Sequence, residues 1–143
     1  MQSDNQSTDP LKSISLLRDY LLPNLLKEDE KEILYWAGKE LARSNTFDSL
    51  EELTEQMTTI FLGELIQVKS TKNTMVYDWS GPLVSHRLTT KTAPSFSLEA
   101  GFLAEGYQQI TGTYTEATYE LDFKKSRVTI LLQSDHHVSL NEN

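Results

Sequence analysis

The spacing of apolar residues changes near Glu64, and this change limits the folds that are open to the chain. Before it, apolar side chains recur every three or four residues, which is the period of an amphipathic helix. After it, they alternate with polar side chains in short segments, which is typical of half-buried strands. A chain of 143 residues, of which 38% are hydrophobic, is long enough for one core. We therefore expect one α+β domain.

The first predicted helix begins at Asp9 and Pro10, because Asp is a good N-cap and Pro suits the first helical position. It is expected to run to about Leu22, where Pro23 ends or kinks it. Its apolar residues fall on one face at helical spacing. The residues of that face are Leu11, Ile14, Leu17 and Leu21.

Two more helices are predicted before the change of period. One begins near Asp29, where acidic residues favour the positive end of the helix dipole. The other is opened by Ser49 and Glu52, which have the spacing of a capping box, and Gly63 should stop it.

Four strands are predicted after Glu64. Residues 65–69 and 74–80 form one hairpin, and the alternating segments 118–123 and 128–133 form another. Between them we expect a polar connection through His86, Arg87 and Thr89, and then a helix over residues 96–111. The order ααα-ββ-α-ββ predicts a four-stranded antiparallel sheet that is covered by helices.

The ends of the chain have polar sequences, and we expect order only between them. Residues 1–8 are predicted to be a disordered leader, residues 9–134 a single α+β domain, and residues 135–143 a flexible tail. No apolar run approaches the length of a membrane helix, and the N-terminus lacks the pattern of a signal peptide. The chain has no cysteine, which fits a reducing compartment. A cytoplasmic protein without membrane insertion is expected.

The charge of the chain excludes two classes of partner. Its formal net charge is -8 at pH 7, with 21 acidic and 13 basic residues. Nucleic-acid binding relies on basic surfaces, so no nucleic-acid partner is expected. An anionic membrane surface would repel the chain in the same way.

No group of residues has the spacing of a catalytic or metal site. His136 and His137 are neighbours and would point to opposite faces of a strand, so we expect no metal there. Haem is not expected either, because no histidine falls in a predicted helix. Glu99 and Glu105 lie six apart on one predicted helix and point in different directions. We therefore predict a protein that is not an enzyme and that holds no cofactor.

Two runs of small residues stand out in the predicted helices. Glycine within a helix costs about 1 kcal/mol relative to alanine, so its presence indicates a close approach to another backbone. The alternatives are tight packing of the helices, the wall of a ligand cavity, or a dimer interface. The small residues concerned are Ala37, Gly38, Ala100, Gly101 and Ala104.

Three residues are candidates for binding a ligand. Trp36 and Phe102 are large apolar side chains within the small-residue runs. Arg87 has a guanidinium fork that suits a ligand carboxylate, although a surface ion pair is the simpler interpretation.

The same two runs, residues 35–43 and 98–105, resemble the signature segments of the YslB-like family of low-GC Gram-positive bacteria. The resemblance extends from about Leu16 to Gln133, and residues 80–88 are similar to the linker of that family. The family in turn resembles the ligand-binding domains of the four-vinyl-reductase type and the subunits of the TRAPP tethering complex.

This resemblance implies a helix-covered, four-stranded antiparallel sheet and a tendency to dimerise through helices. In the ligand-binding relatives it goes with an apolar cavity for a small molecule or an acyl chain. The chain lacks the cysteines of those relatives and has Glu105 where a small residue often stands. The resemblance therefore supplies no catalytic residue.

The leading hypothesis is a non-enzymatic binding module with a helix-lined pocket for a small apolar molecule or acyl chain. The alternative is a dimeric adaptor that binds other proteins and has no ligand. In both cases a homodimer is expected, because three amphipathic helices carry more apolar surface than one sheet needs.

Overall fold

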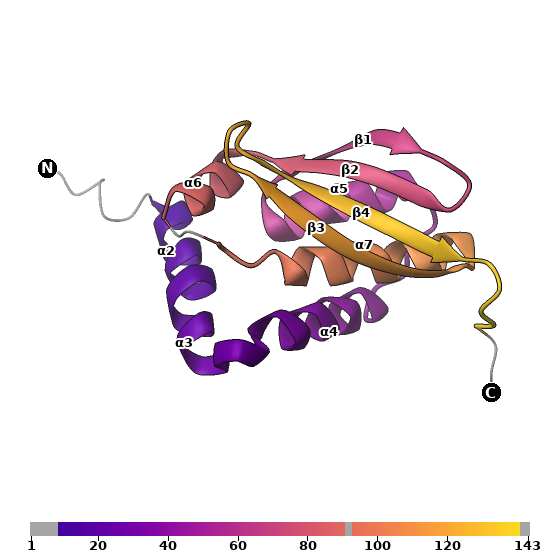
Figure 1. Cartoon of the computed structure of the whole chain (residues 1–143), viewed down its shortest axis with the longest axis horizontal. Helices are drawn as coiled ribbons and strands as arrows, with labels where there is room; N and C mark the ends of the chain where they lie inside the picture. Colours follow the sequence, from indigo (N-terminus) through magenta and orange to yellow (C-terminus); the bar gives the residue numbers. More distant parts are fainter. Residues whose placement is uncertain (1–8, 91–92, 141–143) are drawn as a thin grey trace, which may run out of the picture.

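The computed structural model describes residues 9–90 and 93–140. It is an α+β structure in which helices pack on one face of a four-stranded antiparallel sheet (Figure 1). The predicted fold class is therefore confirmed, although a helix follows the first hairpin where a polar connection was expected. The predicted leader, residues 1–8, lies outside the described residues, as do residues 141–143 of the predicted tail.

The N-terminal helical segment does not stop at Pro23. It consists of α2 (Pro10–Leu16), the π-helical turn η1 (Leu17–Leu21), α3 (Leu22–Leu26) and the 3₁₀ turn η2 (Lys27–Asp29). The wide π turn comes just before Pro23, where an ordinary α turn would meet the proline ring. The Leu22 amide donates to the Leu17 carbonyl, five residues back, so the backbone passes the proline without ending the helical segment.

Helices α4 (Glu30–Arg43) and α5 (Leu50–Phe61) begin where the sequence predicts. Asp29 is the N-cap of α4, and the Ser49 hydroxyl accepts a hydrogen bond from the Glu52 amide at 3.1 Å. The sequence predicted that Gly63 would end α5, and this was wrong. The helix ends one residue earlier, at Leu62, which adopts the left-handed conformation with φ of 58°.

Both predicted hairpins are confirmed; one strand has the predicted bounds and the other three are longer than predicted. They are β1 (Glu64–Ser70) with β2 (Thr74–Ser80), and β3 (Tyr114–Asp122) with β4 (Arg127–Asp135). The sheet order is β1-β2-β4-β3 and all neighbours are antiparallel, so β1 and β3 are the edges. Asp135, which was predicted to be the first residue of the tail, is the last residue of β4.

The predicted polar connection after β2 is instead helix α6 (Pro82–Thr90). Pro82 occupies the first helical position, and the positive φ of Gly81, 134°, turns the chain from the strand into the helix. The helix buries Leu83, Val84 and Leu88. It also carries His86. The prediction that no haem binds assumed that no histidine lies in a helix, and this assumption was wrong.

Helix α7 (Ser97–Thr111) is the centre of the structure. It runs between α4 and the sheet (Figure 1), and most of its residues from Ser97 to Gly106 are buried. Phe102 of α7 points into the core. Its ring packs edge-on against Phe47 and Phe61, at centroid distances of 5.7 and 5.2 Å. The inward side chains of β2 and β4 complete this core; they are Met75, Tyr77, Trp79, Val128, Ile130 and Leu132.

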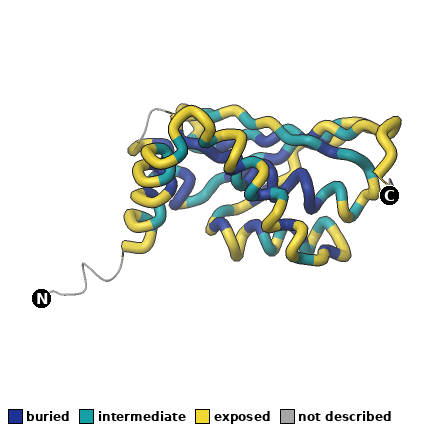
Figure 2. Tube along the Cα trace, turned by 90° about the horizontal axis from the view of Figure 1, so that it is seen from below, coloured by how far each residue is buried: buried dark blue, intermediate teal, exposed yellow. Residues whose placement is uncertain are grey.

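The N-terminal helical segment buries polar residues and leaves part of its apolar face exposed. Its buried residues are Ser15, Arg18 and Asp19, whereas Leu17 and Leu21 are each 47% exposed. Figure 2 shows this segment largely exposed, beside a central helix that is largely buried. We call its exposed apolar side chains the leucine face; they are Leu16, Leu17, Tyr20, Leu21 and Leu25.

Candidate functional site: a groove between α4, α7 and β3

Helices α4 and α7 approach closely because glycine stands at their contact. A methyl group added at Gly101 would overlap the carbonyl oxygen of Tyr35 and lie 3.3 Å from the amide nitrogen of Lys39. A methyl group at Gly38 would overlap the carbonyl oxygen of Leu98. The two backbones are therefore in direct contact, and neither position has room for a side chain.

A groove opens beside this contact, where α4 and α7 meet the edge strand β3. Its volume is about 420 Å³, which lies within the usual range for small-molecule sites. The first half of α4, the first turn of α7 and four consecutive residues of β3 form its walls. The lining residues are Lys31, Glu32, Tyr35, Ser97, Ala100, Glu116, Ala117, Thr118 and Tyr119.

Glu116 is the charged group around which the polar wall of the groove is built. It pairs with the ammonium of Lys39 at 2.7 Å and accepts hydrogen bonds from the hydroxyls of Tyr35 and Tyr114. Burial alone would raise the pKa of Glu116, but these three donors lower it below its ordinary value. The carboxylate is therefore ionised at neutral pH.

Tyr35 covers the open edge of β3. Its hydroxyl oxygen accepts a hydrogen bond from the Ala117 amide at 2.8 Å while its proton is donated to Glu116. Gln108 accepts from the Thr115 amide in the same way, at 3.1 Å. Burial, followed by the bond to Glu116, raises the pKa of Tyr35 far above 10. Tyr35 thus remains a neutral donor, and it satisfies backbone groups that an edge strand leaves free.

Tyr119 also lines the groove, from β3. Its ring packs edge-on to Phe96 at a centroid distance of 6.2 Å. Its hydroxyl is shielded from solvent and has no hydrogen-bond partner among the described residues. An unpaired buried hydroxyl is unfavourable, because it has left water without gaining another partner.

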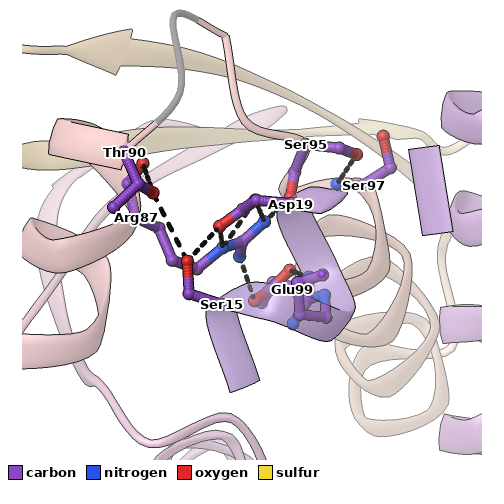
Figure 3. Close-up of polar contacts among 8 residues, drawn as sticks. Ser15, Asp19, Arg87, Thr90, Ser95, Ser97 and Glu99 are labelled. Atoms are coloured by element: carbon purple, nitrogen blue, oxygen red, sulfur yellow. Dashed lines mark hydrogen bonds and ion pairs between the residues drawn. The ribbon is translucent and has the colours of Figure 1, made fainter. Parts of the chain in front are cut away.

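A cluster of buried charges holds the N-terminal helical segment to α6 and α7 (Figure 3). Arg87 donates to both carboxylate oxygens of Asp19, at 2.8 to 3.1 Å. Arg18 donates to Glu99 at 2.7 Å, and Arg87 lies 3.5 Å from the other oxygen of Glu99. The two arginines and the two carboxylates balance in charge, as burial requires.

The rest of the cluster fixes these four groups in place. Arg87 also donates to the Ser95 carbonyl at 2.6 Å and lies over the ring of Phe96, 4.2 Å from its centroid. Ser15 donates to Asp19 at 2.9 Å. Burial opposes the charge on Arg18, but the neighbouring Glu99 raises its pKa overall. The π turn carries Arg18 and Asp19 inward together, although they are adjacent in sequence.

The structure separates the three residues that were predicted to bind a ligand. Trp36 is 59% exposed on the outer side of α4, and Phe102 lies within the core. Arg87 is 1% exposed and paired with Asp19, so the expectation of a surface ion pair was wrong. None of the three lines the groove, whereas Ala100 does.

The small residues of the two helical runs lie in or near the contact of α4 and α7. Gly38 and Gly101 meet the facing backbone, and Ala100 and Ala104 are buried beside them on α7. Ala37 is half-buried on α4. Sequence reasoning missed Tyr35, Glu116 and Tyr119. Tyr35 lies within one of the signature runs, but nothing local indicates that it meets a strand 81 residues later.

In the part of the chain that the structure describes, no three His, Cys, Asp or Glu side chains lie together as metal ligands would. No helix of the same residues is long and apolar enough to cross a membrane.

The sequence matches a family model over most of its length. The family is described as a protein of unknown function, DUF2507, and its model matches residues 12–133. The chain belongs to this family. It is also 32% identical to the protein YslB of Bacillus subtilis (strain 168) over 136 residues, covering 90% of this chain and 92% of that protein. The resemblance to the YslB-like family is thereby confirmed.

Two solved structures share the fold of this DUF2507 member. The phenol-responsive sensory domain of the transcription activator PoxR, solved with phenol, superposes with a TM-score of 0.62 at 17% identity. That match covers 87% of this chain and 74% of the domain. A vinyl-4-reductase family protein from Methanocaldococcus jannaschii gives a TM-score of 0.60 at 18% identity, covering 71% of this chain and 68% of the other. At these identities the matches establish the fold.

Proposed function

We propose that this chain is a non-enzymatic ligand-binding module of the cytosol, which holds a small apolar molecule or an acyl chain in the groove between α4, α7 and β3. The observation that carries the proposal is the groove itself. It has a volume of about 420 Å³ and a partly polar wall beside a close helix contact. A concave site with a few convergent polar groups is the usual form of a small-molecule site.

The fold supports the same function. The PoxR domain, which shares this fold, is phenol-responsive and was solved with phenol. A helix-covered antiparallel sheet of this kind therefore can carry a small-molecule site, even though the identity between the two chains is only 17%.

The titratable groups of the groove favour binding over catalysis. Efficient acid–base catalysis needs a pKa close to the working pH. The pKa of Glu116 is lowered and that of Tyr35 is raised, so both groups move away from neutrality. The two side chains are also hydrogen-bonded to each other. This arrangement favours a fixed wall over a proton-transfer site.

Native mass spectrometry of the protein purified from its own host tests this function. We expect a bound molecule that is released on denaturation. The variant Ala117→Leu should narrow the groove and lose the bound molecule, whereas Ala93→Leu makes the same change at an exposed position outside it. Retention of the molecule by Ala117→Leu, or a wild-type protein that carries none and fails to bind decan-1-ol in titration, would contradict the proposal.

The leucine face supports a second role, that of a homodimer or adaptor. Between Leu16 and Leu26 the two charged residues, Arg18 and Asp19, are both buried. The exposed surface of this stretch is therefore uncharged on a chain of net charge -8. An exposed apolar patch of this kind usually meets a partner.

Light scattering at micromolar concentration tests the dimer. We expect about twice the monomer mass of 16.3 kDa for the wild type and a monomer for Leu21→Glu. A matched control is Leu62→Glu, which places the same charge on a leucine that is 44% exposed outside the leucine face. A wild type that is monomeric, or a dimer that Leu21→Glu leaves intact, would contradict this role for the leucine face.

A further inference from the structure

We propose that two copies of this chain exchange their N-terminal helical segments, so that the segment of each copy docks on α6 and α7 of the other. The inference rests on the homodimer proposed for the leucine face and specifies what the two copies exchange. The feature that points to it is the junction between this segment and α4, where the backbone is strained at Lys27.

Lys27 adopts a backbone conformation that suits glycine. Its φ is 53° and its ψ is -131°, so it lies outside the left-handed helical region that single non-glycine residues can occupy. Leu62 also has a positive φ but lies within that region, with φ and ψ both at 58°. The conformation of Lys27 is costly for a residue with a side chain, and it persists only where the surrounding structure imposes it.

The local sequence does not require the helix to break at this junction. Residues 24–36 contain neither glycine nor proline, and most of them are good helix formers. Helix α3 ends at Leu26 and α4 begins at Glu30, so only the turn η2 separates the two helices. If Lys27 took the ordinary helical conformation, α3 and α4 would join and the strain would disappear. The N-terminal helical segment would then leave its place on its own domain.

Buried charges hold the segment in its docked position. Its fully buried residues are Ser15, Arg18 and Asp19. Arg18 pairs with Glu99 on α7 at 2.7 Å, and Asp19 pairs with Arg87 on α6 at 2.8 Å. A segment that left this position would deprive Arg87 and Glu99 of these partners, which is strongly unfavourable for charges in the interior.

A second copy of the chain supplies the missing partners without any new kind of contact. Its segment carries the same Arg18 and Asp19, so exchange restores both ion pairs and relieves the strain in both chains. The segment lies at one end of the molecule (Figure 1), where it can move without disturbing the sheet. Exchange of an identical element is a low-cost route to a dimer. Because each dimer takes two chains, higher protein concentration should favour the exchanged form.

Disulfide trapping tests the exchange, because the chain has no cysteine of its own. The side-chain oxygens of Ser15 and Thr90 lie 3.3 Å apart, across the contact of the segment with α6. We expect oxidised Ser15→Cys/Thr90→Cys to run as a covalent dimer on a denaturing gel without reductant. The matched control is Ser85→Cys/Ser126→Cys, whose hydroxyl oxygens lie 2.7 Å apart and both belong to the part of the chain that is not exchanged. It should give an internal disulfide and run as a monomer.

The variant Lys27→Gly tests the role of the strained junction. Glycine accepts the bent conformation without strain and weakens a continuous helix, so both effects favour the form without exchange. In the Ser15→Cys/Thr90→Cys background it should lower the ratio of covalent dimer to monomer at least about 10-fold. Glu40→Gly is the control, because position 40 is helical in both forms. A ratio that Lys27→Gly leaves unchanged would overturn the inference.

The remaining outcomes separate the exchange from the homodimer itself. If Ser15→Cys/Thr90→Cys gives only a monomer with an internal disulfide, while light scattering shows a wild-type dimer, the exchange is overturned and the homodimer stands. A wild type that is monomeric in light scattering contradicts both. If no disulfide joins the two positions, the segment does not meet α6 in either form, and the inference is overturned as well.

Discussion

Gly101 is a position at which a single added methyl group should strongly destabilise the fold. On α7, Gly101→Ala would improve helix propensity by about 1 kcal/mol if the position were free. In the structure the new methyl group overlaps the carbonyl oxygen of Tyr35, which is backbone and cannot turn aside. The two helices would have to separate along their whole contact.

The expected size of the effect follows from these two terms. Overpacking costs about 1–3 kcal/mol, and a backbone-to-backbone overlap belongs at or above the upper end of that range. After the gain in propensity, Gly101→Ala should lower the free energy of unfolding by about 2 kcal/mol, and Gly101→Leu by more. Because the free energy of unfolding falls linearly with urea concentration, the urea concentration at the midpoint of unfolding should be lower by about 1 M.

Gly106→Ala is the control on the same helix. A methyl group there would meet the side chain of Leu53, which can move, rather than backbone. Its net effect should stay within about 1 kcal/mol of the wild type. Urea unfolding followed by circular dichroism measures all three variants. A Gly101→Ala protein as stable as the wild type would refute the backbone contact between α4 and α7.

Three further predictions concern the buried charges, Tyr35 and metals. Arg87→Met should lower the free energy of unfolding by about 3–5 kcal/mol, because it leaves Asp19 buried without its partner. In the same urea assay Glu40→Met, at the exposed pair with Arg43, should cost less than about 1 kcal/mol, and equal effects would contradict the assigned burial. Because the pKa of Tyr35 is raised in the fold, its contribution to stability is complete below pH 10 and is lost as the pH rises above it, when the unfolded tyrosine ionises first. Urea midpoints between pH 9 and 11 should therefore fall less steeply in Tyr35→Phe than in the wild type, with Tyr20→Phe as control; an unchanged slope would speak against this. Chelator should leave the melting temperature unchanged, and a clear decrease in a thermal scan would reveal a metal that the fold requires.

Local sequence was sufficient to predict the hairpins and three of the helices. The alternation in residues 118–123 and 128–133 corresponds to β3 and β4, because a strand with one buried face must alternate. Ser49 predicted the start of α5, since its hydroxyl satisfies an amide that every helix leaves free. These features depend on residues close in sequence, so the sequence contains all the information that they need.

Helix α6 shows why a local pattern can fail. Its buried positions include Arg87 as well as Leu83 and Val84, so its apolar face is interrupted by a charge. Because of this charged residue, the segment was predicted to be a polar connection and not a helix. Arg87 can be buried there only because Asp19, 68 residues earlier, neutralises it.

The sequence by itself determined the strands, the helices α4, α5 and α7, and the small residues at the contact of α4 and α7. The tertiary structure decided which side of the N-terminal helical segment is buried. It also decided where the groove lies. Periodicity identifies the apolar face of a helix, but it does not show whether the surface against which the helix packs is apolar or charged. Here that surface presents Arg87 and Glu99, which favour the polar side of the helix, so the leucine face points outward. The groove likewise depends on residues that are distant in the sequence, such as Tyr35 and Tyr119, which both line it and lie 84 residues apart.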